Sequence, residues 1–353
     1  MEGISLEELQ LAARNHGMPL EALRYDVTPV GLHYLLIHYD IPDVDVDAWR
    51  LEVGGRVATP LSLSLADLRG RPATELVSTM ECAGNGRARM EPRAISQPWL
   101  LEAVGTGRWG GTSLAALLAE AEPLDDGVDV VFTGLDGGVE GGVEQRYQRA
   151  LPRADLVGGD AILAWDLNGT ALPPQHGYPL RLVVPGWYGM TNVKWLARID
   201  VLDHVFDGYQ QSTGYRFRRS EDDDGVPVDR MAPRALMIPP GEPDFLTRER
   251  FLTAAPTTLV GRAWSGHGEV TGVEVTCDGG KSWHPAQLEE GTGRWAWRRW
   301  TFHWESPAPG HHVLGCRAAD DADNVQPVVP EWNVGGYANN AVQRVPVTVK
   351  AGS

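Results

Sequence analysis

The pattern of apolar and polar positions changes beyond the middle of the chain. In the first part, strand-like apolar runs at 128–137, 161–169 and 181–187 mix with short helical patterns, and the first two runs end in turn-forming residues. The segment SLADLRG predicts a short helix with Ser64 as its N-cap and Gly70 as its stop. This mixture predicts a mixed α/β architecture for the first part of the chain.

Two further helices follow from the same pattern. Leucines recur through residues 1–25, and SLAALLAEAE at 113–122 has the composition of a helix. The N-terminal segment is acidic and amphipathic, and it lacks the basic start and the apolar stretch of a secretory signal. We therefore expect a cytoplasmic protein, or a periplasmic one if an export signal has been removed. No apolar run reaches the roughly 18 residues that a membrane-spanning helix needs.

The second part of the chain has a different pattern. Residues 219–244 are acidic and proline-rich, which predicts a connecting segment. Strand-like runs such as 257–266, 270–280 and 311–320 then alternate in polarity and are separated by Gly, Pro or Asp, which predicts an all-β sandwich. A chain of 353 residues is longer than one core usually organises. We expect one domain at 1–235 and a second at 236–353.

The charge of the chain limits its partners. With 47 acidic and 31 basic residues the net charge is −16, which makes nucleic acid and anionic membranes poor partners. Only Lys194, Lys281 and Lys350 are lysines. A pocket for an anionic substrate or cofactor would therefore be built mostly of arginine.

The first segment that could carry chemistry surrounds a cysteine. In ELVSTMECAGNGRAR (75–89), an apolar run meets Cys82 and continues into Ala-Gly-Asn-Gly, which forces a turn. Arg87 and Arg89 follow, and nearby positive charge favours a reactive or metal-binding thiolate. A buried structural cysteine before a loop explains the same pattern equally well. No CxxC pair exists, which argues against zinc and iron–sulfur sites.

The second such segment is HGYPLRLVVPGWYGMTNVKWLARIDV (176–201). It places His176, Arg181 and Lys194 around a PGWYG turn, and arginine with lysine at such spacing can hold a phosphate group. Taken alone, the segment favours surface charge that flanks a buried strand.

Together the two segments resemble the sulfite oxidase family of molybdenum enzymes. The resemblance rests on CAGN with Arg87 five residues after Cys82, followed about a hundred residues later by HGYPLRLVVPG and VKWL. It extends through LAWDLNGTALPPQHG to GRAWSGHGEVTGVEVTCDGGKSW and covers about residues 30–349. It implies an α+β chain, in which a mixed α/β molybdenum-cofactor domain precedes an immunoglobulin-like β-sandwich through which two copies dimerise.

The resemblance also implies roles for single residues. Cys82 would be the one protein ligand to molybdenum, because a soft thiolate suits a redox-active transition metal. Arg87, Trp99 and Trp165 would lie beside Cys82 in the substrate pocket and complete the candidate catalytic set. Contacts to the pterin and to its phosphate end are implied for His38, Ala83, Gly84, Asn85, Asp136, His176, Arg181 and Lys194.

The substrate pocket departs from the family pattern. Sulfite-oxidising members supply three arginines and a tyrosine, and Arg87 matches one of these arginines. The arginine expected two residues before His38 is Leu36, the tyrosine expected in LAYxxNG is Trp165, and the arginine expected in the C-terminal WN segment is Gly335. The pocket would thus be less basic and more apolar than a sulfite site, unless other arginines such as Arg89, Arg93 or Arg108 refill it.

The resemblance implies an oxidoreductase that carries a molybdenum–molybdopterin cofactor, with no haem or flavin expected. Its reaction would be two-electron oxygen-atom transfer, foremost the oxidation of sulfite or a related sulfur compound, with electrons passed to an external protein. A small oxyanion or a sulfur or nitrogen compound would be the substrate. A reductase of S- or N-oxides, a sulfane dehydrogenase and a non-enzymatic molybdopterin-binding relic stay open as alternatives.

Overall fold

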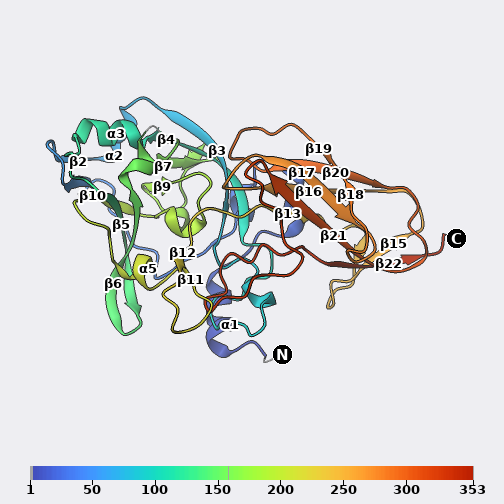
Figure 1. Ribbon diagram of the computed structural model, residues 1–353. Helices are drawn as coiled ribbons and strands as arrows, with labels where there is room; N and C mark the ends of the chain where they lie inside the picture. Colours follow the sequence, from blue (N-terminus) through green and yellow to red (C-terminus); the bar gives the residue numbers. More distant parts are fainter. Residues whose placement is uncertain (1–2, 158, 353) are drawn as a thin grey trace.

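The computed structural model describes residues 3–157 and 159–352 and has two lobes (Figure 1). Strands β1 to β10 and helices α2 and α3 form a mixed lobe, and strands β13 to β22 form a lobe of β-structure alone. The α+β class with a C-terminal β-sandwich is therefore confirmed. Among the described residues, no helix is long and apolar enough to cross a bilayer.

Two five-stranded sheets build the mixed lobe. One has the order β2 (Leu61–Leu63), β1 (Leu51–Gly55), β10 (Leu196–Leu202), β5 (Asp129–Glu140) and β6 (Val143–Pro152). In the other, β3 (Thr74–Glu81), β4 (Val104–Ser113), β7 (Ile162–Leu167) and β8 (Thr170–Ala171) follow one another and β9 (Arg181–Val183) pairs with β7. Only the β1–β10 pairing is parallel in these sheets, and the long β5–β6 hairpin projects from the lobe in Figure 1.

Two short helices of the mixed lobe, α2 and α3, form where the sequence predicts them. Helix α2 (Leu65–Arg69) has Ser64 as its N-cap and Asp67 in a reciprocal capping box. Helix α3 (Leu114–Ala121) buries its leucines against the sheet. Two single-turn helices, α4 (Arg153–Leu156) and α5 (Tyr209–Ser212), follow β6 and β10.

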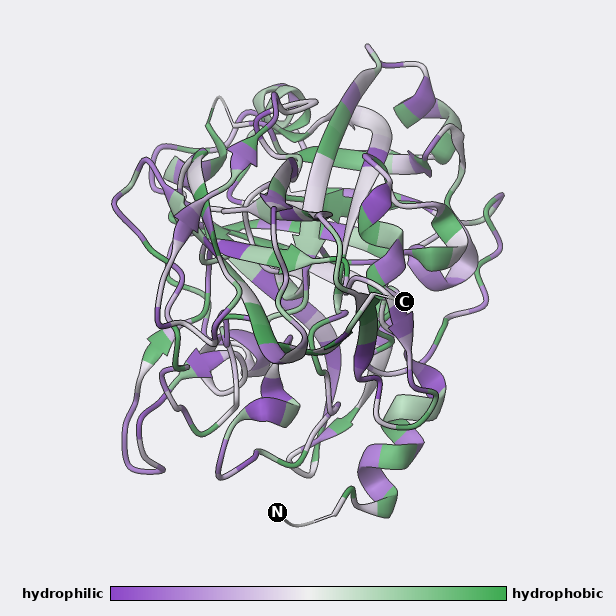
Figure 2. Cartoon of the chain, turned by 90° about the vertical axis from the view of Figure 1, so that its right-hand side faces the viewer, coloured by the Kyte–Doolittle hydropathy of each residue, from purple (hydrophilic) through white to green (hydrophobic). Residues whose placement is uncertain are grey.

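The N-terminal helix is shorter than predicted. Helix α1 covers Leu6–Arg14 alone, and the chain returns as a short 3-10 turn at Leu20–Arg24, so the prediction of one helix over 1–25 is wrong. Gly17 and Pro19 stand in the break, and both residue types disfavour a continuous helix. Helix α1 carries hydrophilic and hydrophobic residues in alternation (Figure 2).

The acidic, proline-rich stretch is more than a connection. Within 219–244, β12 (Val226–Pro227) pairs with β11 (Arg216–Phe217), and β13 (Arg234–Met237) is a fully buried strand of the sandwich. The prediction of a plain linker is therefore wrong for its C-terminal half. Ala235, Leu236 and Met237 are buried there, and β13 pairs along its whole length with β16 (Thr257–Trp264).

The sandwich consists of a four-stranded and a six-stranded sheet. The first runs β13, β16 (Thr257–Trp264), β20 (Arg298–Trp304) and β19 (Gln287–Leu288). The second runs β14 (Glu242–Pro243), β15 (Arg250–Thr253), β22 (Val345–Lys350), β21 (Gly310–Asp320), β17 (Val270–Thr276) and β18 (His284–Pro285). Trp300 and Cys316 are fully buried in the core between these sheets.

The two lobes share a hydrophobic cluster. Trp264 and Trp297 come from the sandwich half of the chain but belong to the core of the mixed lobe. The Trp297 indole donates to the carbonyl oxygen of Asp26 at 2.8 Å, and its backbone amide donates to the Thr79 hydroxyl at 2.8 Å. The sandwich is therefore docked directly behind β3, the strand that leads to Cys82.

Candidate functional site

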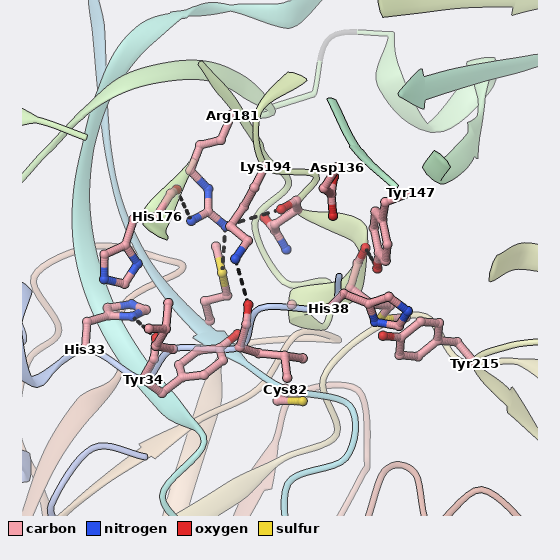
Figure 3. A pocket seen from close by; sticks show the side chains of 16 residues that line it. His33, Tyr34, His38, Cys82, Asp136, Tyr147, His176, Arg181, Lys194 and Tyr215 are labelled. Carbon is pink, nitrogen blue, oxygen red and sulfur yellow. Dashed lines mark hydrogen bonds between the residues drawn. The ribbon is translucent and has the colours of Figure 1, made fainter. Parts of the chain in front are cut away.

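A pocket opens in the mixed lobe, and Cys82 lies at its base (Figure 3). It brings together six residues that the sequence singles out, namely His38, Cys82, Asp136, His176, Arg181 and Lys194. These residues are up to 156 positions apart in the chain, from His38 to Lys194, and the two sheets bring them to one cavity.

The turn after β3 fixes the Cys82 thiol. The Cys82 carbonyl accepts from the Asn85 amide at 2.9 Å, and the Asn85 side chain donates to Glu81 at 2.9 Å and to Leu101 at 3.1 Å. Cys82 is 6% exposed. Burial raises the pKa of its thiol, while the charge of Arg87 and the Gly84 amide oppose that shift. The thiol therefore stays protonated unless a bound metal or another cation stabilises its thiolate.

A segment of the sandwich packs against this turn. The Ala338 amide donates to the Ala83 carbonyl at 2.8 Å, and the Asn339 side chain donates to the Gly86 carbonyl at 2.8 Å. Gly86 has φ +91°, and a Cβ atom there would meet the Asn339 carbonyl oxygen at 2.8 Å. Only glycine combines this backbone with this close approach.

Positive charge gathers at one end of the pocket, away from Cys82 in Figure 3. Arg181 stacks on Trp109 at 4.6 Å and donates to the His176 carbonyl at 3.0 Å, and Lys194 donates to the Leu36 carbonyl at 2.6 Å. Within the described residues, neither Arg181 nor Lys194 forms an ion pair with a carboxylate.

Burial lowers the pKa values of the titratable groups at this end of the pocket. It lowers the pKa of Lys194 to about 7 and that of Arg181 to about 10. It also lowers the pKa of His176 and, to about 4, that of His33. Without an anion the pocket thus disfavours its own positive charge, and a bound anion would reverse this effect.

Asp136 and His38 occupy different walls. Burial raises the pKa of Asp136 to about 6, and its Oδ1 atom has no hydrogen-bond partner among residues 3–157 and 159–352. The His38 ring lies 2.9 Å from a carboxylate oxygen of Glu140, near the tip of the β5–β6 hairpin. Glu140 also accepts from Tyr39 at 3.2 Å and from Gln210 at 2.7 Å, so the hairpin is tied to this wall of the pocket.

Other predicted residues lie around the pocket and not on it. The described lining does not include Ala83, Gly84 or Asn85, which build the turn behind Cys82. Their contact with a cofactor stays a prediction.

The same holds for Arg87, Trp99 and Trp165. Arg87 donates to the Gly335 carbonyl at 2.8 Å and lines a neighbouring hollow of the surface. Trp99 shares a hydrophobic cluster with Cys82, and Trp165 is a half-buried residue of β7. Their catalytic roles stay predictions.

The structure shows where the other arginines lie that could restore the positive charge of the pocket. Arg93 forms an ion pair with Glu8, Arg108 pairs with Glu75 at 3.3 Å, and Arg89 is exposed. None of the three lines the described part of the pocket. Leu36 does line it, and its side chain adds apolar surface.

Sequence reasoning missed several lining residues, among them His33, Tyr34, Tyr147 and Tyr215. His33 lies edge-on to His176 with ring centroids 5.7 Å apart, and its Nε2 atom has no partner. The tyrosines bring phenol groups to the Cys82 side. A clue was available for Tyr147, because its strand alternates and places it on the same side as the buried Leu151.

The residues fit a cofactor with a metal at one end and an anionic group at the other. Cys82 offers a soft ligand, and the opposite end offers Arg181, Lys194 and His176 without an acidic partner among the described residues. Unpartnered polar atoms of Asp136 and His33 point to a polar ligand between them. A pocket of this chemistry defines a metal–pterin oxidoreductase.

Comparisons with known proteins agree with that class. Residues 38–210 match the family model described as "Oxidoreductase molybdopterin binding domain", and residues 230–350 match "Mo-co oxidoreductase dimerisation domain". The boundary predicted at 235 stays a prediction. The sulfite oxidase of Gallus gallus is 39% identical over 338 residues, which cover 90% of this chain and 72% of the relative.

A nitrate reductase and the solved structure of a sulfane dehydrogenase also match the chain. The NADH nitrate reductase of Lotus japonicus is 33% identical over 95% of this chain, which spans only 40% of that protein. The crystal structure of the sulfane dehydrogenase SoxCD from Paracoccus pantotrophus matches with a TM-score of 0.81 and 27% identity, over 95% of this chain and 86% of that chain. The chain belongs to the sulfite oxidase family of molybdopterin-dependent oxidoreductases. It is an oxidoreductase, and its cofactor is molybdenum–molybdopterin.

Proposed function

We propose that the protein oxidises sulfite or a related sulfur compound by two-electron oxygen-atom transfer. The observation that carries the proposal is the position of Cys82, which is buried at the base of a pocket. The other end of this pocket holds Arg181 and Lys194, and neither forms an ion pair with a carboxylate of the described residues. The similarity to sulfite oxidases over most of the chain supports the choice of sulfur chemistry.

The proposal assigns roles to the pocket residues that the sequence singles out. Cys82 holds molybdenum, while His176, Arg181 and Lys194 hold the anionic end of the pterin and His38 and Asp136 contact its body. The bound cofactor supplies two-electron redox chemistry together with transfer of an oxygen atom. Leu36 and the buried tyrosines keep water from the space beside Cys82.

Tyr34 and Tyr215 act as hydrogen-bond donors toward the substrate, whereas the Tyr147 hydroxyl donates to the Met190 carbonyl at 2.8 Å. Burial raises the pKa of Tyr34, Tyr147 and Tyr215, so all three are neutral phenols at physiological pH. A neutral phenol donates to an oxygen atom of an oxyanion without adding charge. Donors at fixed positions are effective because they need no reorganisation when charge develops.

Electrons leave to a separate acceptor protein, and the sandwich joins two copies into a homodimer. The match of residues 230–350 to a dimerisation domain supports the second point. A cytoplasmic location stays a prediction.

Sulfane dehydrogenation is the second candidate. The fold of SoxCD matches nearly the whole chain at 27% identity, and Leu36 makes the pocket less basic than the family pattern for sulfite. Similarity to nitrate reductases keeps reduction of an N- or S-oxide as a further alternative.

The test is sulfite-dependent reduction of ferricyanide by protein with about one molybdenum per chain. Turnover that is lost in Cys82→Ser and kept in Cys277→Ser supports the proposal, since Cys277 lies in the sandwich. No turnover of sulfite by loaded protein contradicts it and favours the alternatives. Absence of molybdenum from protein made with ample molybdate would point to the relic.

A further inference from the structure

Arg149 occupies a position where the strand pattern calls for an apolar residue. Along β6, Tyr147, Arg149 and Leu151 are buried and lie on the same side of the strand, because side chains alternate with period two. Arg149 is only 1% exposed. A charged residue in an inward-facing row is costly, so its presence demands a compensating interaction.

No carboxylate provides that compensation within the described part of the chain. The Nη1 atom of Arg149 donates to the carbonyl oxygen of Gln210 in α5, and its Nε atom has no partner. One carbonyl dipole does not neutralise a buried guanidinium. Burial accordingly lowers the pKa of Arg149.

Arg149 is linked to the Cys82 pocket through a row of rings. Its guanidinium carbon lies 5.7 Å from the ring centre of Tyr215, and Tyr215 lines the pocket together with Cys82 (Figure 3). The ring centres of Tyr215 and Tyr337 are 5.3 Å apart, and the guanidinium carbon of Arg87 lies 5.0 Å from the ring centre of Tyr337. We call Arg87, Tyr337, Tyr215 and Arg149 the arginine–tyrosine row.

The backbone at Tyr215 is held in an uncommon conformation. Its φ is +49°, in the left-handed region that side chains other than glycine rarely adopt. The Tyr215 carbonyl accepts from the Val228 amide at 2.9 Å, which holds the residue in place. Such strain concentrates at functional sites, where it directs a side chain.

We propose that Arg149 is a specificity-determining residue that favours an anionic sulfur substrate, by placing a buried positive charge behind Tyr215. It acts through Tyr215, so it is a positioning residue and does not touch the reacting atoms. It also provides charge that the pocket lacks at Leu36 and Gly335. The inference rests on the proposed function, because it names the anionic class of substrate for the same site.

The test uses protein that carries about one molybdenum per chain. Arg149→Met removes the charge and keeps most of the length, and Arg149→Lys keeps the charge. Arg108→Met is the matched control, because it removes one positive charge from an exposed ion pair on β4. Two quantities are measured: KM and kcat for sulfite, and the affinity for sulfate by calorimetry.

We expect Arg149→Met to raise KM for sulfite and to weaken sulfate binding by tenfold or more, with kcat changed less than threefold. The KM for sulfite and the sulfate affinity of Arg149→Lys should stay within threefold of the parent values. The same is expected of Arg108→Met. The Tm of cofactor-free Arg149→Met should equal or exceed that of the parent, because an uncompensated buried charge is gone. A merely structural arginine would lower Tm instead.

Sulfate affinity of Arg149→Met within twofold of the parent overturns the inference. If Arg149→Met does not fold, Arg149→Gln replaces it. If neither variant folds while Arg149→Lys folds, the charge of Arg149 serves stability, and this result also overturns the inference. If loaded parent protein does not oxidise sulfite, the proposed function fails, but the difference in sulfate affinity between Arg149→Met and Arg108→Met still decides this inference.

Discussion

The guanidinium of Arg234 donates to the carboxylate of Glu81, and both side chains are 1% exposed. Glu81 directly precedes Cys82, whereas Arg234 opens the first strand of the sandwich. The Trp264 indole donates to the second oxygen of the same carboxylate at 2.9 Å. The two domains are thus joined immediately behind the turn that carries Cys82.

Breaking this pair should destabilise the protein and empty the site. Glu81→Ala leaves the Arg234 charge buried without a partner, which costs about 3–5 kcal/mol. We expect a lower Tm and loss of molybdenum, measured by thermal unfolding and metal analysis. Glu75→Ala is the control on the same strand, since its exposed pair with Arg108 at 3.3 Å should contribute less than about 1 kcal/mol. Equal losses in both variants would contradict this role of Glu81.

Lys194 should lower the stability of the cofactor-free protein and favour cofactor binding. Its folded pKa of about 7 lies below its ordinary value of 10.5 because of burial. Between these two values the unfolded chain binds the extra proton, so this group makes the free energy of unfolding rise with pH. Lys194→Met should therefore raise the Tm of the cofactor-free protein at pH 7, and the gain should shrink toward pH 10.

The same variant should retain less cofactor, because a cation is missing from the anionic end of the pocket. Molybdenum and pterin content after purification measure this effect. Full cofactor retention in Lys194→Met, or a Tm gain that does not depend on pH, would argue against the assigned role.

Gly86 should not tolerate a side chain. Its φ of +91° is unfavourable for alanine, and a Cβ atom would meet the Asn339 carbonyl oxygen at 2.8 Å. Gly86→Ala should lower the free energy of unfolding by about 1–3 kcal/mol and reduce molybdenum content. Gly31→Ala is the control, because no atom lies within 4 Å of a Cβ built there. An unchanged Tm in Gly86→Ala would show that the contact with Asn339 is not restrictive.

Glu140 should tie the β5–β6 hairpin to the pocket in a pH-dependent way. Burial alone would raise the pKa of Glu140, but hydrogen bonds from His38, Gln210 and Tyr39 outweigh burial and lower it. A lowered folded pKa means that the stabilisation is present above about pH 4.5 and is lost as the pH falls below that value. Glu140→Gln should lower Tm slightly at pH 7, and this loss should shrink as the pH falls below about 4.5.

Glu144→Gln serves as the control, because Glu144 lies on the same hairpin and is exposed. Hydrogen exchange of the hairpin amides should increase in Glu140→Gln alone. Equal exchange in the two variants would show that the contacts of Glu140 do not restrain the hairpin.

Local patterns in the sequence predict the parts of this fold that local interactions determine. The capping box of α2 needs only Ser64 and Asp67, which are three residues apart, and its bounds follow from them. The motif around Cys82 and the cations at 176–194 likewise lead to the pocket. The buried strand β13 escapes prediction, because the apolar residues of ALM are masked by the acidic and proline-rich sequence around them.

Long-range packing explains the rest. Nothing near Arg149 in the sequence indicates that α5 and Tyr215 surround its guanidinium. Tyr215 lies in a segment without a motif, and only the tertiary fold brings it beside Cys82. The ion pair between Glu81 and Arg234 spans 153 positions, so neither partner can be chosen from the sequence pattern.

The contact between the Cys82 turn and the segment at 338–339 has a consequence for biosynthesis. Ala83 and Gly86 are translated about 250 residues before their hydrogen-bond partners Ala338 and Asn339. The turn therefore reaches its final packing only after residues 338–339 have left the ribosome. Cofactor insertion into a finished site must thus follow the synthesis of this segment, and a nascent chain that ends before residue 338 presents Cys82 on a turn without its support.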